Sequence, residues 1–312
     1  MEKMNYSFNL SDVISFLNSN DLLKKNICFE NDFSLYGFSS IFETTLGTIS
    51  WASSKKKSLV DWSTINCSVI VCDQEFEKEF ENILQNVIYL PVDNPRKVFI
   101  KLLKHFYPEK KLNGIEKTAI ISENCKLGKD VYIGHFVIIE DNVQIGDNTI
   151  IHNNVYIHEN TRIGSNCIIH SGAKIGIDGF GYEKQEDGTY EKFLHIGGVT
   201  IGDNVEIKSN TCINRGTLSN TVIKKNVKIN DLCHIAHNVI IGEATIITSG
   251  CSIGGSTKIG RNCWIAPRVA IREGLTIHDN VLIGYGSVVV KSIEKECTII
   301  GVPAKPLKKG KD

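Results

Sequence analysis

The sequence predicts a mostly β protein in which a left-handed parallel β-helix follows a small α/β domain. The main observation is an aliphatic residue at every sixth position over 115–175 and 223–289, with a shorter run over 201–213. A period of six fits neither the 3.6 residues of a helical turn nor one long alternating strand, so the chain must turn after each short strand. Three such strands form one triangular coil, and stacked coils form a prism.

Glycine and cysteine keep the same register. Glycine often follows the aliphatic position, where it suits a corner with unusual backbone angles or a close approach, at Gly128, Gly134, Gly146, Gly164, Gly202, Gly242, Gly254, Gly260 and Gly284. Small inward cysteines are expected four residues after it, at Cys125, Cys167, Cys233, Cys251 and Cys263. The ten cysteines include no C-x-x-C pair, so neither a zinc site nor a disulfide framework is indicated.

Residues 1–108 lack the period and form the predicted α/β domain. We expect a helix over 13–18, after the capping sequence NLSD, and an amphipathic helix over 96–106, after DNP. The run CSVIVC is typical of a strand. The predicted division is therefore an α/β domain at 1–108, a β-helix at 109–296 with a loop insertion at 176–200, and a C-terminal tail at 297–312.

The overall composition excludes some kinds of partner. The 312 residues include 35 Lys and Arg and 35 Asp and Glu, so the formal charge is zero, and no broad attraction to nucleic acid or to an anionic membrane is expected. The N-terminus lacks a signal-peptide pattern, and no apolar run approaches the length of a membrane span. We expect a cytoplasmic protein without membrane insertion.

Two interruptions of the period indicate where a site would lie. The first is the segment 176–200, and the second is the step from Ile213 to Ile223, which is ten residues instead of six. Insertions into a solenoid form surface loops, and such loops often carry binding function. A site is therefore expected beside them.

Three motifs carry a resemblance to a known family: GIDGFGY at 176–182, IGDNVEIKSNTCINRGTL at 201–218 and INDLCHIAHNVIIG at 229–242. With the front domain, they resemble the UDP-3-O-acylglucosamine N-acyltransferases of lipid A synthesis and related N-acyltransferases that modify nucleotide-linked amino sugars. The resemblance spans nearly the full chain. It implies an acyltransferase of class EC 2.3.1, and a homotrimer whose active sites lie between neighbouring prisms.

By the same resemblance, His237 of the IAHN motif is the general base. The chemistry agrees, since an ammonium must lose a proton before it attacks a thioester, and imidazole accepts protons near neutral pH. The structural alternative is a corner imidazole bonded to the backbone. Asn238 either orients this base or is a solvated corner residue.

The resemblance also implies substrate contacts. It places the sugar and acyl pocket at Phe180, Gly181, Tyr182, Asn214 and Arg215. The alternative is that the glycine-rich stretch only makes a sharp exit from the β-helix. In the front domain, Trp51 aligns with an aromatic residue that stacks on the base, and a buried core tryptophan is the alternative.

Several residues depart from the lipid A pattern. Ser54 and Lys57 replace an asparagine and a tyrosine near the stacking position, Asn214 replaces an aspartate, and Gly274 replaces a second histidine. The ending GVPAKP resembles coenzyme A-dependent acetyltransferases. Positive charge for the coenzyme A phosphates is expected from Arg268, Arg272 and Lys305.

We therefore favour an N-acyltransferase that moves an acyl group from acyl-CoA to the amine of a dTDP- or UDP-linked amino sugar in surface glycan biosynthesis. Backbone amides of the prism are the expected oxyanion donors. The alternative is the lipid A enzyme itself, which uses a hydroxyacyl carrier protein.

Two other functional classes remain open at this stage. A zinc hydratase of the carbonic anhydrase type would use histidines between subunits, but the spacing of His234 and His237 does not fit it, and no metal is expected. A scaffold or sugar-binding protein without catalysis would share the same repeat.

Overall fold

The computed structural model describes residues 7–27, 29, 31–108, 110 and 112–307, except the side chains of residues 56, 57 and 59. The chain divides into two compact units, Met1–Lys111 and Leu112–Asp312, which we call the front unit and the prism unit. None of the described helices is long and apolar enough to cross a membrane.

The front unit is built on a three-stranded parallel sheet in the order β3-β4-β5. Its strands are β3 (Ile49–Trp51), β4 (Val69–Cys72) and β5 (Ile88–Pro91), and its helices are α1 (Leu10–Ser19), α2 (Gln74–Phe80) and α3 (Pro95–Phe106). Two short 3-10 helices, η1 (Ser54–Leu59) and η2 (Trp62–Thr64), and the antiparallel pair β1 (Phe8–Asn9) and β2 (Ser34–Leu35) complete it.

Local sequence explains these elements. All four residues of β4 are buried, as expected for the central strand of a covered sheet. Asn94 caps α3, because its side chain accepts from the N–H of Lys97 at 3.0 Å, and Pro95 suits the first helical turn. The helices predicted at 13–18 and 96–106 are present, and α1 begins three residues earlier because Asn9 and Asp12 form a capping box.

The prism unit consists of three sheets whose strands follow one another around each coil. The first sheet has nine strands: β7 (Ile120–Ile121), β10 (Ile138–Ile139), β13 (Tyr156–Ile157), β16 (Lys174–Ile177), β21 (Cys212–Asn214), β24 (His234–Ile235), β27 (Ser252–Ile253), β30 (Ala270–Ile271) and β33 (Val288–Val289). The second has eight: β8 (Lys126–Leu127), β11 (Gln144–Ile145), β14 (Thr161–Ile163), β19 (Val199–Ile201), β22 (Thr221–Ile223), β25 (Ile240–Ile241), β28 (Lys258–Ile259) and β31 (Thr276–Ile277).

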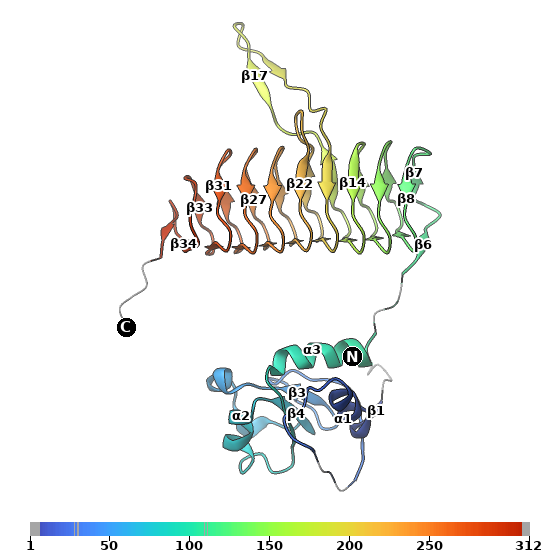
Figure 1. Cartoon of the computed structure of the whole chain (residues 1–312), viewed down its shortest axis with the longest axis vertical. Coiled ribbons are helices and arrows are strands. Elements are labelled where there is room, and N and C mark those ends of the chain that lie inside the picture. The colour runs from blue at the N-terminus through green and yellow to red at the C-terminus, as the bar shows by residue number, and fades with distance from the viewer. Residues whose placement is uncertain (1–6, 28, 30, 109, 111, 308–312) are drawn as a thin grey trace. The chain divides into compact units, whose positions relative to one another are not determined.

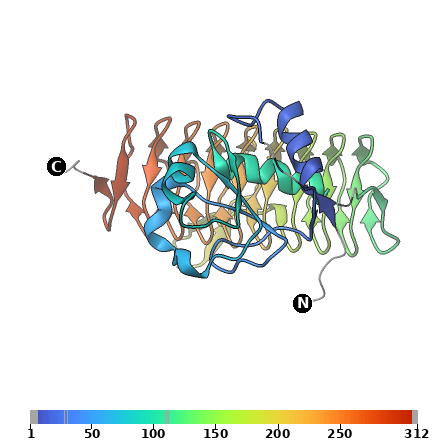
Figure 2. The same ribbon diagram turned by 90° about the horizontal axis from the view of Figure 1, so that it is seen from below.

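The third sheet has eleven strands: β6 (Gly114–Ile115), β9 (Tyr132–Ile133), β12 (Ile150–Ile151), β15 (Ile168–Ile169), β20 (Glu206–Ile207), β23 (Lys228–Ile229), β26 (Ile246–Ile247), β29 (Trp264–Ile265), β32 (Leu282–Ile283), β34 (Thr298–Ile300) and β35 (Lys305–Pro306). Apart from β35, all neighbours in the three sheets are parallel, and Figure 2 shows the coils following one another from green to red. This is the predicted left-handed parallel β-helix.

The six-residue period forms the core of the prism. Ile235 pairs with Ile213 on one side and with Ile253 on the other, and all three side chains are fully buried. Stacked aliphatic residues of this kind remove a continuous apolar column from water, at roughly 25 cal/mol per Å² of buried apolar surface. Because each coil covers its neighbour, the core needs the whole stack.

Asparagine, rather than glycine, occupies most of the left-handed corners. Eleven asparagines have φ between 55° and 62°: Asn142, Asn148, Asn154, Asn160, Asn166, Asn204, Asn210, Asn226, Asn238, Asn262 and Asn280. Asparagine tolerates this region better than most residues. The glycines that follow the aliphatic positions serve close approach instead; a Cβ on Gly242, for example, would lie 2.3 Å from the carbonyl carbon of Gly260.

The predicted inward cysteines are buried at Cys167, Cys233, Cys251 and Cys263, while Cys125 is partly buried. Their thiols donate to backbone carbonyls of the prism, as Cys233 does to Thr248 O at 3.1 Å. Burial raises the pKa of Cys167 and of Cys263, so these thiols stay protonated. They fill space rather than react.

Both interruptions of the period are visible as longer connections. The insertion forms an antiparallel hairpin, β17 (Tyr182–Lys184) with β18 (Tyr190–Lys192), which projects from the prism in Figure 1. At the other end, β34 pairs with β32 and buries Ile299 completely. Part of the segment that the sequence analysis separates as a tail therefore belongs to the third sheet.

Candidate active site

Three connections, two of them the interruptions of the period, lie at one corner of the prism, in successive coils. Each leads from the first sheet to the second: 178–198 joins β16 to β19, 215–220 joins β21 to β22, and 236–239 joins β24 to β25. Because β16, β21 and β24 pair side by side, the three connections are neighbours. We call this place the insertion corner. The two interruptions of the period and the segment with His237 therefore meet there.

His237 lies at the insertion corner between two glycines. Its ring is partly buried, and a Cβ on Gly255, one coil further along, would lie 2.7 Å from both Cε1 and Nε2. On the other side, a Cβ on Gly179 of the inserted loop would lie 2.9 Å from Cδ2. A larger residue at either position would displace the imidazole, so the two glycines define its slot.

Asn238 hydrogen-bonds to His237 and also holds the corner. Its Oδ1 accepts from the N–H of Thr217 at 2.8 Å, which leaves its Nδ2 at 3.1 Å from Nδ1 of His237. The same Nδ2 donates to Thr217 Oγ1 at 3.0 Å. Because an amide nitrogen only donates, Nδ1 of His237 is the acceptor in this arrangement, and the neutral ring carries its proton on Nε2.

His195 is a second imidazole at the insertion corner, and no sequence pattern indicated it. It is 5% exposed, and its ring centroid lies 5.3 Å from that of His237, with the ring planes at 70°. Its Nδ1 lies 2.8 Å from Phe193 O and donates to it, so the neutral ring has a lone pair on Nε2. A lone histidine at the end of an insertion carries no periodicity that would distinguish it from a surface histidine.

Three buried polar atoms gather around the inserted loop. Among the described residues, the buried side-chain atoms without a hydrogen-bond partner are Thr161 Oγ1, His195 Nε2 and Asn214 Oδ1. A Cβ on Gly176 would lie 2.9 Å from the Thr161 hydroxyl, and Asn214 donates to Asp178 O at 2.8 Å. Such unpaired groups are unfavourable. Their grouping at one corner is typical of a site that completes its hydrogen bonds with a ligand.

Arg215 is engaged within the protein. It is 6% exposed, and its Nε donates to Gly176 O at 2.8 Å. Its two terminal nitrogens donate to Glu159, one to Oε1 and one to the backbone O, both at 3.0 Å. Arg215 thereby fastens the start of the inserted loop to the preceding coil. The N–H groups of Arg215 thus position the inserted loop beside the two imidazoles.

The loop residues Phe180, Gly181 and Tyr182 take two different positions. Phe180 is 87% exposed, and its ring centroid lies 4.9 Å from that of Tyr182, so the two form an exposed aromatic pair. A Cβ on Gly181 would lie 3.3 Å from Cε1 of His195. Gly181 therefore packs beside the imidazole pair, whereas the two aromatic rings point outward.

The electrostatics of the corner favour a neutral His237. Burial lowers the pKa of His237, and the neighbouring imidazoles of His195 and His234 lower it further. The hydrogen bond from Lys192 lowers the pKa of Asp178, so this carboxylate stays ionised, 3.9 Å from Nε of Arg215. Within the described residues, no group of three His, Cys, Asp or Glu side chains is placed to hold a metal ion.

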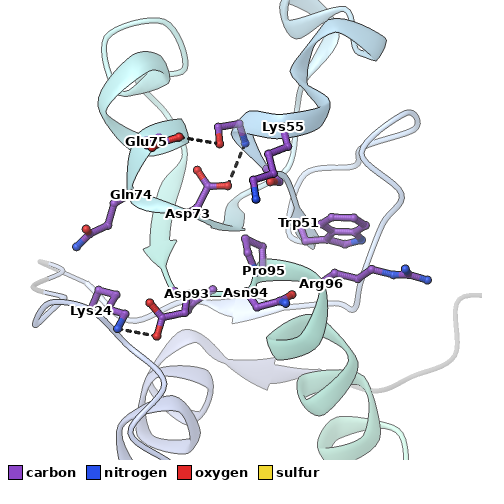
Figure 3. Close-up of a pocket in the computed structure, with 13 residues that line it drawn as sticks. Lys24, Trp51, Lys55, Asp73, Gln74, Glu75, Asp93, Asn94, Pro95 and Arg96 are labelled. Carbon is purple, nitrogen blue, oxygen red and sulfur yellow. Dashed lines mark hydrogen bonds and ion pairs between the residues drawn. The ribbon is translucent and has the colours of Figure 1, made fainter. Parts of the chain in front are cut away.

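The front unit has a separate cavity of about 430 Å³ at the C-terminal edge of its sheet. Figure 3 shows it between the ends of the strands and the beginning of α3. It is lined by Lys24, Trp51, Ser53, Ser54, Lys55, Asp73, Gln74, Glu75, Val92, Asp93, Asn94, Pro95 and Arg96. Ligands of open α/β sheets bind at this edge.

The structure places two of the three predicted nucleotide contacts at this cavity. Trp51 lines it at the end of β3, and Figure 3 shows Arg96 extending on the same side as the indole ring. The N–H of Ser54 donates to Asp73 Oδ2 at 3.0 Å, and its hydroxyl donates to Glu75 Oε2 at 3.2 Å. The side chain of Lys57 lies outside the described part of the structure.

The predicted coenzyme A residues lie at two different corners. Arg268 and the turn 301–304 are at the corner from the third sheet to the first, since Gly286 donates to Pro267 O and Ala304 to Val288 O. Arg272 follows β30 and lies at the insertion corner, two coils beyond His237. Arg268, Arg272 and Lys305 are all exposed. The structure does not gather them into one cluster.

Comparison with known proteins places the chain in a family. The model "Bacterial transferase hexapeptide (six repeats)" matches residues 142–176, 220–255 and 256–291. A UDP-3-O-acylglucosamine N-acyltransferase of Coxiella burnetii is 35% identical over 285 residues, which cover 85% of this chain and 82% of that protein. The chain belongs to the UDP-3-O-acylglucosamine N-acyltransferase family. This acyltransferase matches its relative in both units, because the prism unit alone makes up less than two thirds of the chain.

Other relatives match over shorter stretches of the chain. A UDP-3-O-acylglucosamine N-acyltransferase of Bordetella avium is 41% identical over 134 residues, which cover 42% of this acyltransferase and 37% of that protein. Among solved structures, LpxA from Acinetobacter baumannii is 28% identical with a TM-score of 0.56, and the match covers 62% of this chain and 73% of that one. The β-helix is thus shared with an acyltransferase of known structure.

Proposed function

We propose that this acyltransferase moves an acyl group from an acyl carrier protein to the amine of a UDP-linked 3-O-acylglucosamine. The observation that carries the proposal is the 35% identity to a protein of that name across both units. The acyl-CoA donor and dTDP sugar favoured from the sequence alone have less support, since the three residues assigned to coenzyme A do not form one cluster.

His237 is the proposed base. The sugar amine loses its proton to this imidazole as the nitrogen attacks the thioester carbonyl, and the proton then passes to the departing thiolate. Burial supports the role, because the lowered pKa of His237 keeps the ring neutral near pH 7. Asn238 is the proposed support of the corner beside the ring, because it is bonded to Thr217, and Gly255 leaves room for the imidazole. We assign the oxyanion to backbone N–H groups of this corner.

The inserted loop is the proposed wall of the sugar and acyl pocket. Asn214 offers an unpaired Oδ1 to the sugar, and the exposed pair Phe180 and Tyr182 offers apolar surface to the acyl chain. Arg215 and Gly181 support the loop from inside. The apolar residues at the end of the insertion, Phe193, Leu194 and Ile196, are 53%, 70% and 69% exposed, which supports a neighbouring subunit at this corner.

The cavity of the front unit is the proposed nucleotide site. Trp51 supplies a ring for the uracil base, and Arg96, which forms no ion pair within the described residues, supplies charge for a phosphate near the beginning of α3. Ser54 is held at the same cavity by Asp73. Lys57 remains a proposed contact.

We further propose that the enzyme is a cytoplasmic homotrimer. The nine cysteines among the described residues are free thiols, which suits a reducing compartment. The oligomer is tested by light scattering on the purified protein, where a trimer gives three times the chain mass of 34.7 kDa.

A second candidate is the acyl-CoA-dependent transferase of a dTDP- or other UDP-amino sugar. The specific observation in its favour is Asn214, whose neutral amide replaces the carboxylate expected beside the amine of the lipid A precursor. Arg268, Arg272 and Lys305 are its proposed coenzyme A contacts.

One experiment separates the two candidates. Acyl carrier proteins and acyl-CoAs of several chain lengths are each offered with UDP-3-O-acylglucosamine, UDP-amino sugars and dTDP-amino sugars, and thiol release is followed. We expect turnover with the carrier protein and UDP-3-O-acylglucosamine. Turnover only with acyl-CoA and a dTDP-amino sugar would replace the first candidate by the second, and no thiol release with any pair would refute both.

A further inference from the structure

The two imidazoles of the insertion corner have complementary hydrogen bonding. The Nδ1–H of His195 donates to Phe193 O at 2.8 Å, so Nε2 of His195 can only accept. This atom is buried and has no partner within the described part of the chain. A buried acceptor without a donor is costly, so a donor is expected to reach it.

The orientation of the His237 ring decides whether it can act as a base. With Nδ1 facing the amide of Asn238 at 3.1 Å, the neutral ring holds its proton on Nε2, and no lone pair is free for an amine proton. A half-turn about the Cβ–Cγ bond exchanges Nδ1 with Cδ2 and Nε2 with Cε1. The two orientations have the same shape, so packing does not distinguish them. The half-turn gives up the bond from Asn238 Nδ2, which keeps its bond to Thr217 Oγ1 at 3.0 Å.

Gly179 shows what the half-turn would bring together. A Cβ on Gly179 would lie 2.9 Å from Cδ2 of His237 and 2.5 Å from Nε2 of His195, so both ring atoms lie beside Gly179. The half-turn moves Nδ1 of His237 to the position of Cδ2. The ring centroids, 5.3 Å apart, leave room for one hydrogen bond between the rings and for no further group.

We propose that His195 is the positioning residue of His237. In the resting enzyme, Nδ1–H of His237 donates to Nε2 of His195, and Nε2 of His237 is free to act as the base. The inference rests on the proposed function. The sugar amine is then the nucleophile, His237 is the base, and the imidazole of His195 orients the base.

The reaction then balances with no further reactant. The neutral sugar amine forms the N–C bond to the thioester carbonyl and gives one proton to Nε2 of His237. The resulting imidazolium keeps its Nδ1–H on His195. As the C–S bond breaks, the thiolate takes the proton from Nε2, which leaves an amide, a free thiol and neutral His237.

Few titratable side chains lie near the pair of imidazoles. Burial lowers the pKa of His237, and so do the imidazoles of His195 and of His234, which lies in β24. Asp178 faces His195 and is itself held by Lys192 and Arg215.

The tautomer of His237 tests the inference directly. In full-length protein with ¹⁵N-labelled histidine, the His237 signals are identified by their absence from His237→Ala. We expect the Nδ1–H tautomer in the wild-type protein and the Nε2–H tautomer in His195→Phe, which keeps a ring but removes the acceptor. A wild-type ring protonated on Nε2 would overturn the inference.

Activity gives the second readout. We expect His195→Phe to lower kcat by about 10- to 100-fold and to lower the apparent pKa of the base, because the imidazolium loses its acceptor. His195→Gln, whose amide oxygen can accept, should recover most of kcat and also shows that the corner folds. A His195→Phe enzyme within threefold of wild type, with the same pH profile, would contradict the role of His195.

The outcomes also separate this inference from the proposed function. If wild-type protein transfers no acyl group to any amino sugar, the proposed function fails while the tautomer still tests the pairing. If wild type is active and His237→Ala is not, but His195→Phe is unchanged, only the role of His195 fails.

Discussion

Asn238 directs its Nδ2 to Nδ1 of His237 at 3.1 Å, while its Oδ1 accepts from the backbone N–H of Thr217 at 2.8 Å. The backbone donor fixes which end of the amide faces the imidazole, because only an oxygen can accept from it. Thr217 belongs to the ten-residue step of the period, so these hydrogen bonds link that irregular connection to the connection 236–239 in the next coil. The irregular part of the repeat thus builds the surroundings of the proposed base.

His237→Ala should lower kcat by about 10²- to 10⁴-fold, because general-base catalysis contributes rate factors of that order. The measurement is thiol release at saturating substrate, with circular dichroism to confirm that the β-helix is intact. His278→Ala is the matched control, since His278 is an exposed imidazole at another corner whose Nδ1 bonds only to Asp279 O. A loss below about threefold in His237→Ala would mean that another group takes the proton.

The pH dependence should follow His237. Its pKa is lowered by burial and by His195 and His234, so the ring is neutral above a pKa that lies below the ordinary value of about 6.5. Activity that needs the neutral base should therefore be complete by pH 7 and decline as the pH falls through that lowered pKa. Titration of the His237 ring signal by NMR measures it directly. A midpoint above 6.5 would contradict the burial of the ring.

The sequence predicted the β-helix well because its signal is periodic. Each aliphatic position, such as Ile235, repeats the same local environment, so many residues report one architecture. Both interruptions lie at the corner of His237, which is the candidate site. His195 could not be found in this way, because its role depends on a contact across the fold, between the end of an insertion and a residue 42 positions later.

Arg215 shows the same limit for a charged residue. The sequence places it in the motif, but only the folded chain shows that its guanidinium donates to Gly176 O and Glu159. Likewise, the glycines after the aliphatic positions were open to two interpretations, unusual backbone angles or close approach. The packing of Gly242 against Gly260 decides for close approach.

Gly255→Ala should inactivate the enzyme without unfolding it. The added Cβ would lie 2.7 Å from Cε1 and Nε2 of His237, and Gly255 does not have positive φ, so alanine tests the contact with the ring. A displacement of about 1 Å at a reacting group can lower the rate by about 10²-fold. Ser252→Ala, at an exposed position of the same strand region, is the control. Wild-type kcat in Gly255→Ala would show that the position of the His237 ring next to Gly255 does not matter for catalysis.

Arg215→Met should destabilise the prism unit by about 2 kcal/mol, because it removes hydrogen bonds from a buried charged group and leaves Gly176 O without this donor. The free energy of unfolding from urea titration, at fixed protein concentration, measures it. Glu159→Gln is the control: it removes only the charge of a half-exposed carboxylate and keeps the backbone acceptor, so it should cost less than about 1 kcal/mol. Equal losses of unfolding free energy in the two variants would show that the ion pair with Glu159 provides most of the stabilisation by Arg215.

Trp51→Ala should weaken UDP binding by about tenfold or more, because stacking of a base on an aromatic ring is worth about 1–3 kcal/mol. Trp51→Phe keeps a ring and should stay within about threefold of wild type. Calorimetric titration of the full-length protein with UDP measures both, and Trp264→Ala, which removes an exposed tryptophan of the prism, is the control. Because Trp51 is partly buried, thermal unfolding must show that Trp51→Ala keeps its fold. Unchanged UDP affinity in that folded variant would exclude stacking on Trp51 and move the nucleotide away from the cavity at β3.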